Sequence, residues 1–214
     1  MITSWRPWWK PEGYFLRCFD EDQLGTELTA VPITGRVAFA AACAERLAPS
    51  YRRFVERTGR GDADAHRRNL DRVWAALVGS GMREEEISES LSFCMGLTPR
   101  EDDGPWVPEQ ASAEDACAAL AYTLRCYLEG SPREAAWAAR RAYEAAHQSV
   151  VHALGMEGDA PIAEDRVLDH QVVQAELTSQ ELDLRELRAT PECSMQEAIA
   201  RMRERAIASK GLEF

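Results

Sequence analysis

Two alanine-rich amphipathic segments, joined by a tight turn between Val37 and Leu77, constrain the fold of this chain more than any other feature. Helical spacing places Val37, Ala44 and Leu47 on one face of the first segment. Because alanine side chains are small, a neighbouring helix can approach that face closely. The turn at residues 58–62 contains two glycines, which favour the end of one helix before the next begins. The stretch therefore predicts a compact helical hairpin.

Apolar residues recur at helical spacing along most of the remaining chain, and no segment alternates as a strand would. The expected helices cover residues 21–30, 34–58, 62–77, 83–96, 113–129, 132–154, 163–189 and 194–209. Their expected N-terminal caps are Asp20, Thr34, Asp62 or Asp64, Ser112 with Asp115, Ser131 with Glu134, and Ser194 with Glu197. Pro49 is expected to kink or restart its helix. The sequence thus predicts an all-α, single-domain bundle of about seven to eight helices.

The first 18 residues differ from the rest, because three tryptophans crowd between prolines and a glycine without helical periodicity. We interpret residues 1–18 as a non-helical, Trp-rich extension that straps across the helical body and buries its rings. The alternative is an exposed aromatic patch, in which Trp5, Trp8 and Trp9 contact a partner. Residues 19–210 form the expected helical domain, and residues 211–214 are interpreted as a vector-derived remnant.

The composition is that of a soluble globular chain, with 45% hydrophobic residues and no apolar run near the roughly 20 residues that span a bilayer. Prolines and charges interrupt the start, where a signal peptide needs an apolar stretch, so we expect a cytoplasmic location. Cys43, Cys117 and Cys126 lie in helical patterns, where a thiol acts as a small core residue. The even number of cysteines permits a disulfide framework, but a reducing compartment favours free thiols and the spacing does not suit zinc.

Acidic residues outnumber basic residues by 36 to 25, which gives a net charge of −11. This charge repels the phosphates of DNA and RNA, so no nucleic acid is expected as a partner. A basic protein would instead be attracted. The alternative is that the acidity serves solubility alone.

Glu144 and His147 form a Glu-x-x-His pair, which places a carboxylate and an imidazole on one helix face. Di-iron bundles need this motif twice together with two further glutamates, and no other histidine has a glutamate three positions before it. The chain also lacks a Gly-x-Ser-x-Gly motif and a glycine-rich phosphate loop. We therefore expect no catalytic residue, metal or cofactor. A small-molecule or metal-binding helical enzyme remains the alternative function.

Asp62, Asp64 and His66 could supply metal ligands, but we expect a capping aspartate and an exposed His66 in the first helical turn. The arginines around this turn form a local basic cluster, which consists of Arg52, Arg53, Arg57, Arg60, Arg67 and Arg68. Such a cluster could bind a phosphate at the helix N-terminus. The favoured interpretation is a solvated face whose arginines pair with acids of the same chain.

The run VAFAAACAERLAPSYRRFVERTGRGD, followed by NLDRVWAAL, resembles the YjaG-like bacterial proteins, a family of unknown function (DUF416). Three later segments are also similar, AEDACAALAYTLRCYLEG, PREAAWAARRAYEAAHQ and DHQVVQAELTSQELDLREL, so the resemblance covers roughly residues 20–188. It implies a single all-helical domain, and it implies no activity and no site residues. The chain departs from the family in its Trp-rich start and at His170-Gln171, where the relatives tend to have His-Pro.

The leading hypothesis is a non-catalytic protein that binds another protein. Its concrete form is an immunity or antitoxin-type protein that neutralises a basic bacterial toxin. The size, the acidity and the lack of catalytic motifs favour this hypothesis over an enzyme, and a homodimeric scaffold is a third alternative. The expected partner-binding residues are Trp5, Trp8, Trp9, Glu84, Glu85, Glu86, Asp102, Asp103 and Trp106.

Overall fold

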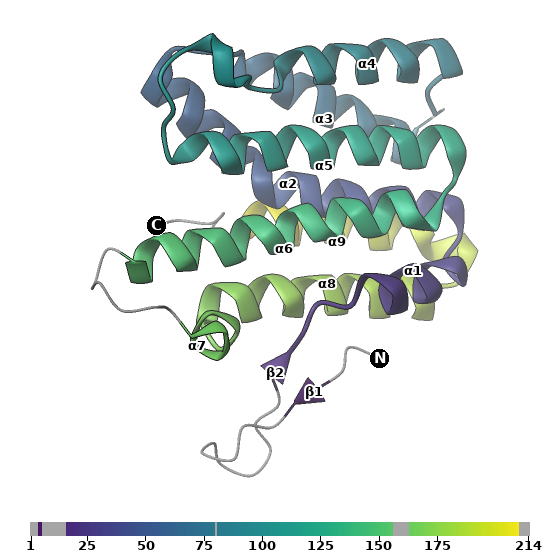
Figure 1. The fold of residues 1–214 in the computed structure, drawn as a ribbon. Helices are drawn as coiled ribbons and strands as arrows, with labels where there is room; N and C mark the ends of the chain where they lie inside the picture. Colours follow the sequence, from purple (N-terminus) through teal and green to yellow (C-terminus); the bar gives the residue numbers. More distant parts are fainter. Residues whose placement is uncertain (1–3, 6–15, 80, 156–162, 210–214) are drawn as a thin grey trace.

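The computed structural model describes residues 4–5, 16–79, 81–155 and 163–209, and this part of the chain is helical almost throughout (Figure 1). Its nine α-helices are α1 (Glu21–Thr29), α2 (Ile33–Thr58), α3 (Ala63–Val78), α4 (Glu84–Leu97), α5 (Glu109–Glu129), α6 (Pro132–Gly155), α7 (Glu164–Leu168), α8 (Gln171–Ala189) and α9 (Met195–Ala208). Two short 3-10 helices, η1 (Glu101–Asp103) and η2 (Glu192–Ser194), precede α5 and α9. The predicted all-α, single-domain fold is confirmed. Among the described helices, none combines the length and apolar character that crossing a bilayer requires.

A short strand pair near the N-terminus was not predicted by the sequence. The strands β1 (Ser4–Trp5) and β2 (Leu16–Arg17) pair antiparallel, with Ser4 opposite Arg17 and Trp5 opposite Leu16. Each strand has only two residues, so the fold class is unchanged. The side chains of Trp8 and Trp9 lie outside the described residues, as does that of Trp5, so burial of these rings stays a prediction.

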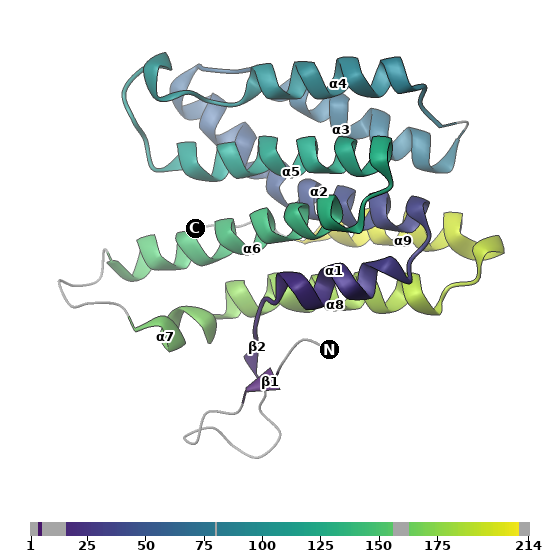
Figure 2. The same cartoon turned by 45° about the vertical axis from the view of Figure 1, so that its right-hand side comes forward.

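The helices form stacked layers, with α3 and α4 on one side and α1 and α8 on the other (Figures 1 and 2). Between these layers α2 packs against α3, α5, α6, α8 and α9. Every residue from 37 to 47 of α2 is buried, as expected for a helix covered from several directions. The small alanines on this stretch allow the surrounding helices to come close.

Several predicted helix ends are confirmed by the backbone and its hydrogen bonds. The Asp20 side chain accepts a hydrogen bond from the Gln23 amide, and the Asp62 side chain accepts one from the Ala65 amide. Gly59 ends α2 in the left-handed conformation, with a φ of 67°, which a residue without a Cβ adopts at little cost.

Other boundaries differ from the prediction. Thr34 does not cap α2, which begins at Ile33 after Pro32, and the helix continues through Pro49 without interruption. The Ser194 side chain makes no capping hydrogen bond to α9. Helix α5 begins at Glu109, four residues before the expected start at 113 and upstream of the predicted Ser112 cap.

The long helix expected over residues 163–189 is two helices. Its break lies at His170, whose backbone is extended and whose Nδ1 accepts a hydrogen bond from the Val172 amide. The Gln174 side chain then donates to the carbonyls of Leu168 and Arg17 and accepts from the Arg17 amide. These bonds satisfy backbone groups at the break and fasten β2 to the bundle.

Arg36 joins the ends of two helices at one point. Its Nε donates to the carbonyls of Leu28 and Val31, at 2.9 and 2.8 Å, and its Nη2 donates to the Thr29 carbonyl at 2.8 Å. Its Nη1 donates to the Gly130 carbonyl, just after α5, at 2.7 Å. The carbonyls at a helix C-terminus lack partners within the helix, so this guanidinium closes α1 and holds it beside α5.

We therefore expect Arg36→Ala to lower the free energy of unfolding by about 2–3 kcal/mol, because it removes several hydrogen bonds from a charged donor. Urea denaturation followed by circular dichroism measures the loss. The control is Arg52→Ala on the same helix, which breaks an exposed pair with Glu56 at 3.7 Å and should cost less than about 0.5 kcal/mol. Equal losses in the two variants would contradict this role of Arg36.

Candidate partner-binding surface

Glu144 and His147, the Glu-x-x-His pair on α6, contact different partners. Glu144 accepts hydrogen bonds from Arg140 at 2.7 Å and pairs with Arg141 at 2.8 Å. His147 Nε2 lies 2.9 Å from the Glu164 carboxylate of α7. In the described ranges, no three His, Cys, Asp or Glu side chains are grouped as metal ligands would be. The arrangement therefore ties α6 to its neighbours and gives the enzyme alternative no geometric support.

The prediction that His66 is exposed is wrong. The imidazole is buried at 1% exposure, stacks on the Tyr51 ring at a centroid distance of 4.7 Å, and places Nε2 3.5 Å from the Ala116 carbonyl. Burial lowers the pKa of His66 to about 4. The sequence predicted a capping aspartate, Asp62 or Asp64, and Asp62 is the cap. It did not predict that α5 covers the first turn of α3.

Four of the six arginines in the basic cluster around the turn between α2 and α3 pair with acids of the same chain, in line with the favoured interpretation. Arg67 contacts Glu45 and Asp71, while Arg57 contacts Glu109 at 3.2 Å. The weaker pairs are Arg52 with Glu56 and Arg68 with Asp62. Positive charge at this turn is therefore largely neutralised within the molecule.

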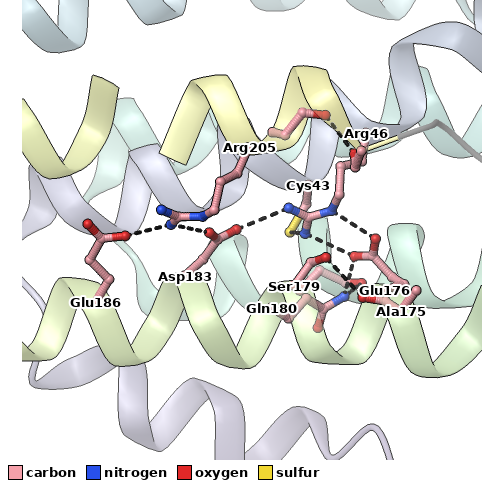
Figure 3. Close-up of polar contacts among 12 residues, drawn as sticks. Cys43, Arg46, Ala175, Glu176, Ser179, Gln180, Asp183, Glu186 and Arg205 are labelled. Carbon is pink, nitrogen blue, oxygen red and sulfur yellow. Dashed lines mark hydrogen bonds and ion pairs between the residues drawn. The ribbon is translucent and has the colours of Figure 1, made fainter. Parts of the chain in front are cut away.

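The most deeply buried charges centre on Arg46 of α2 (Figure 3). Its Nε and Nη2 donate to the two oxygens of Glu176, at 2.8 and 3.0 Å, and its Nη1 donates to Asp183 at 3.0 Å. Nη2 also donates to the Cys43 sulfur at 3.3 Å, and Arg205 donates to the other oxygen of Asp183 at 2.8 Å.

The side chains of Arg46, Glu176 and Asp183 are at most 6% exposed, so a substrate cannot reach them. Burial raises the pKa of the Cys43 thiol beyond its usual range, so this sulfur is not a ready thiolate nucleophile. Because these charges satisfy one another, the cluster joins α2 to α8 and does not form a reaction centre.

Asp115 on α5 is, after His66, a second buried group whose pKa is shifted. Burial raises its pKa to about 7, against the opposing charge of Arg141, whose Nη1 lies 3.3 Å away. Such a pKa suits a general acid or base. However, Asp115 is only 6% exposed and faces α6, so it has no room for a substrate.

The six cysteines all lie within the described residues, and all are free thiols. Cys43, Cys117 and Cys126 are buried, as predicted. Burial raises the pKa of each. These thiols therefore act as core residues.

The predicted acidic residues line the outermost helix and its following loop. Glu84, Glu85 and Glu86 begin α4, whereas Asp102 and Asp103 lie beyond its other end (Figure 1). Helix α4 has 14 residues, so these two groups are about 20 Å apart at 1.5 Å per residue. The Glu86 carboxylate accepts a hydrogen bond from the Arg83 amide at 2.9 Å, which lowers the pKa of Glu86. No described residue forms an ion pair with Glu84 or Glu85.

Large apolar side chains are exposed between and beside these acids. Trp106, one of the predicted residues, is 68% exposed. Phe93 and Met95 on α4, which the sequence did not single out, are 51% and 58% exposed, and Glu89 on the same helix is also exposed. Phe93 and Met95 lie outside the buried stripe of Ile87, Ser90 and Cys94. Large apolar residues outside the buried stripe were the feature of the sequence that could have predicted this exposed apolar surface.

We name this surface the acidic α4 face; its residues are Glu84, Glu85, Glu89, Phe93, Met95, Asp102, Asp103 and Trp106. Its exposed aromatic and methionine side chains are of the types enriched at protein–protein interfaces, and acidic residues surround them. The described part of the N-terminus, β1 and β2, lies beyond α8, on the opposite side of the molecule from α4 (Figures 1 and 2). The structure therefore does not bring the backbone of Trp5 to this face.

Comparisons with known proteins agree with this fold. A family model described as "Protein of unknown function (DUF416)" matches residues 23–211. The "Uncharacterized protein YjaG" of Escherichia coli K12 is 31% identical over 98 residues, which make up 46% of this chain and 49% of that protein. The match thus spans about half the length of this curated relative.

A solved structure gives the broader likeness. The crystal structure of a DUF416 family protein from Shewanella baltica OS155 matches with a TM-score of 0.71 and 20% sequence identity. The match covers 86% of this chain and 93% of that one. At this identity the likeness concerns the fold alone.

The burial of His66 predicts a specific pH dependence. Its pKa of about 4 lies below the usual 6.5, so between these values the folded state binds fewer protons than the unfolded state. Stability should therefore fall as pH drops from 6.5 to 4, by up to about 1.4 kcal/mol per pH unit. His66→Gln lacks this contribution. The difference in unfolding free energy between the unsubstituted protein and this variant should therefore become smaller as the pH falls from 6.5 to 4.

Urea denaturation at pH 7.5, 6, 5 and 4 measures that gap. Asp115→Asn is the matched control, because the raised pKa of Asp115 makes the folded state bind more protons between about pH 4 and 7. Removing this carboxyl should therefore change the pH slope in the opposite sense. A gap between the unsubstituted protein and His66→Gln that is constant with pH would contradict the assignment.

The Arg46 cluster predicts an asymmetric response to substitution. Arg46→Met leaves Glu176 and Asp183 buried next to an apolar side chain, so we expect a loss of about 3–5 kcal/mol in unfolding free energy. Combining Arg46→Met with Glu176→Met should recover part of that loss, because one uncompensated charge is removed. Denaturant titration of the two variants measures the difference, and a double variant less stable than Arg46→Met would refute the expectation.

Proposed function

The chain belongs to the DUF416 family of proteins of unknown function, and we propose that it is a non-catalytic protein that binds a basic partner protein through the acidic α4 face. The observation that carries this proposal is the exposure of Phe93, Met95 and Trp106 beside unneutralised carboxylates. Exposed aromatic and methionine side chains are enriched at interfaces. The carboxylates would steer a basic protein towards them.

The distribution of charged groups supports a basic partner over an acidic one. Most described arginines are committed to acids or carbonyls of the same chain, as in the Arg46 cluster and at Arg36. The net charge of −11 is therefore concentrated on carboxylates such as Glu84 and Glu85, which remain available. Neutralisation of a basic toxin, as by an immunity or antitoxin-type protein, is a concrete form of this function.

Helix α4 is suited to this role by its position. It forms the outer edge of the bundle and packs mainly on α5, with fewer contacts to α3 (Figure 1). Its buried residues Ile87, Ser90 and Cys94 face inward, so changes on the opposite side leave the core intact. Binding and stability can therefore be separated by substitution.

Site-specific photo-crosslinking in the native host tests the proposal. A benzophenone side chain at Phe93 should capture a basic protein, whereas the same group at Ile207, which is 59% exposed on α9, should not. Glu85→Lys with Glu89→Lys should lower the Phe93 crosslink about tenfold, because like charges then face the partner. Circular dichroism should show unchanged folding.

Capture of the same proteins from both positions, or of none, would refute the proposal. So would a crosslinked protein that is acidic, or a crosslink that survives the charge reversal. The identity of the captured protein then decides whether toxin neutralisation is the role.

A further inference from the structure

A groove of about 420 Å³ opens at the end of the bundle where α2 and α9 begin and α3 and α5 end. This is the right-hand end of the molecule in Figure 1. Val37, Leu77, Met195 and Ile199 line the groove and are almost fully buried, so they provide an apolar floor. The volume falls in the range of about 300–1,000 Å³ that is typical of ligand sites.

A large aliphatic side chain is exposed at the groove. Ile33, a lining residue at the start of α2, is 55% exposed. Exposed apolar groups that border a hollow mark an interaction site more clearly than single ones scattered over a surface. An apolar group entering this groove would cover the exposed Ile33 side chain and so remove it from water.

The groove margin carries negative charge. Glu192 lines the groove, and Glu84 and Glu85 begin α4 shortly after Gly81, which forms another part of the wall. The nearby Arg83 is paired with Glu86 at 3.3 Å, and Arg125 is paired with Glu134 at 3.0 Å. No described residue forms an ion pair with Glu192, so its carboxylate is available to a cation.

We infer that this groove receives an aliphatic side chain from a lysine- or arginine-rich segment of the partner. This inference rests on the proposed function and extends it, because Gly81 of the groove wall precedes Glu84 of the acidic α4 face by three residues in the chain. The aliphatic group fills the apolar floor, while the flanking cations contact Glu192, Glu84 and Glu85. A second copy of this chain, with a net charge of −11, meets electrostatic repulsion at this margin, as do anionic lipids.

Cys193 offers a direct optical probe for the groove. It follows the lining residue Glu192 and is the one exposed cysteine of the six; Cys18 is half-buried and the other four are buried. In a Cys18→Ser background an environment-sensitive dye on Cys193 reports on binding nearby. The test peptide has two leucines flanked on each side by two lysines, with both termini blocked.

The dye titration should give saturable binding of this peptide. Replacing its leucines by serine, or its lysines by glutamate, should weaken binding at least about tenfold, since each change removes one of the two recognition elements. In the protein, Glu192→Lys should weaken binding about tenfold by reversing a charge at the contact. Thr34→Trp, which fills the groove from an exposed lining position, should weaken it at least as much.

Two matched variants control for net charge and for bulk. Glu204→Lys makes the same charge change on the exposed side of α9, and Gln171→Trp places the same ring on the exposed first turn of α8. Neither residue lines the groove. Both should bind the peptide within about twofold of the unsubstituted protein, and all four variants should retain the helical circular dichroism spectrum.

The outcomes separate the groove from the proposed function. Peptide binding could be unaffected by Glu192→Lys and Thr34→Trp but lost in the Glu85→Lys, Glu89→Lys variant. That result would overturn the groove inference and leave the proposed role of the acidic α4 face standing. Absence of peptide binding also overturns the groove inference. In that case the crosslink from Phe93, which does not depend on the peptide, decides the proposed function separately.

Discussion

The central position of α2 depends on small side chains along its buried stretch. Alanine fills five of the eleven positions from 37 to 47, so the backbones of several helices can approach α2 closely. Larger residues there would hold the neighbouring helices apart and leave voids that a close-packed core does not tolerate. Phe39 and Leu47 are the largest apolar side chains of this stretch. The layered arrangement of the whole molecule follows from this constraint.

A helix covered on all sides must also bury the charged residues that its sequence carries. Glu45 and Arg46 are neighbours in the chain but point to different helices, because successive helical residues are about 100° apart. Glu45 accepts hydrogen bonds from Arg67 and from the Trp74 indole on α3, whereas Arg46 binds Glu176 and Asp183 on α8. Buried charges require such partners. The two residues therefore fix both neighbouring helices against α2.

The same pairing determines the character of the surface. Most described arginines form ion pairs with carboxylates or hydrogen bonds with helix-end carbonyls. The carboxylates without such a partner lie mainly on outer faces such as that of α4. His66 and Asp115, two of the described titratable groups whose pKa values are strongly shifted, are enclosed by helices. The accessible features are instead an acidic helix with exposed Phe93 and Met95, and a groove with an acidic margin. These features support a binding role.

The sequence by itself determined the fold class, the positions of most helices, the cap at Asp20, a capping aspartate at Asp62 or Asp64, and the acidity of the exterior, because spacing and capping are local properties. Tertiary structure decided the burial of His66, the break at His170 and the exposure of Phe93 and Met95. It also decided that the predicted acids lie at both ends of α4 and that the groove opens near Glu192. Arg17 and Gln174 are 157 positions apart in the chain and yet exchange hydrogen bonds. Periodicity identifies the apolar face of a helix, but only packing determines which distant neighbour covers it and which charges remain in water.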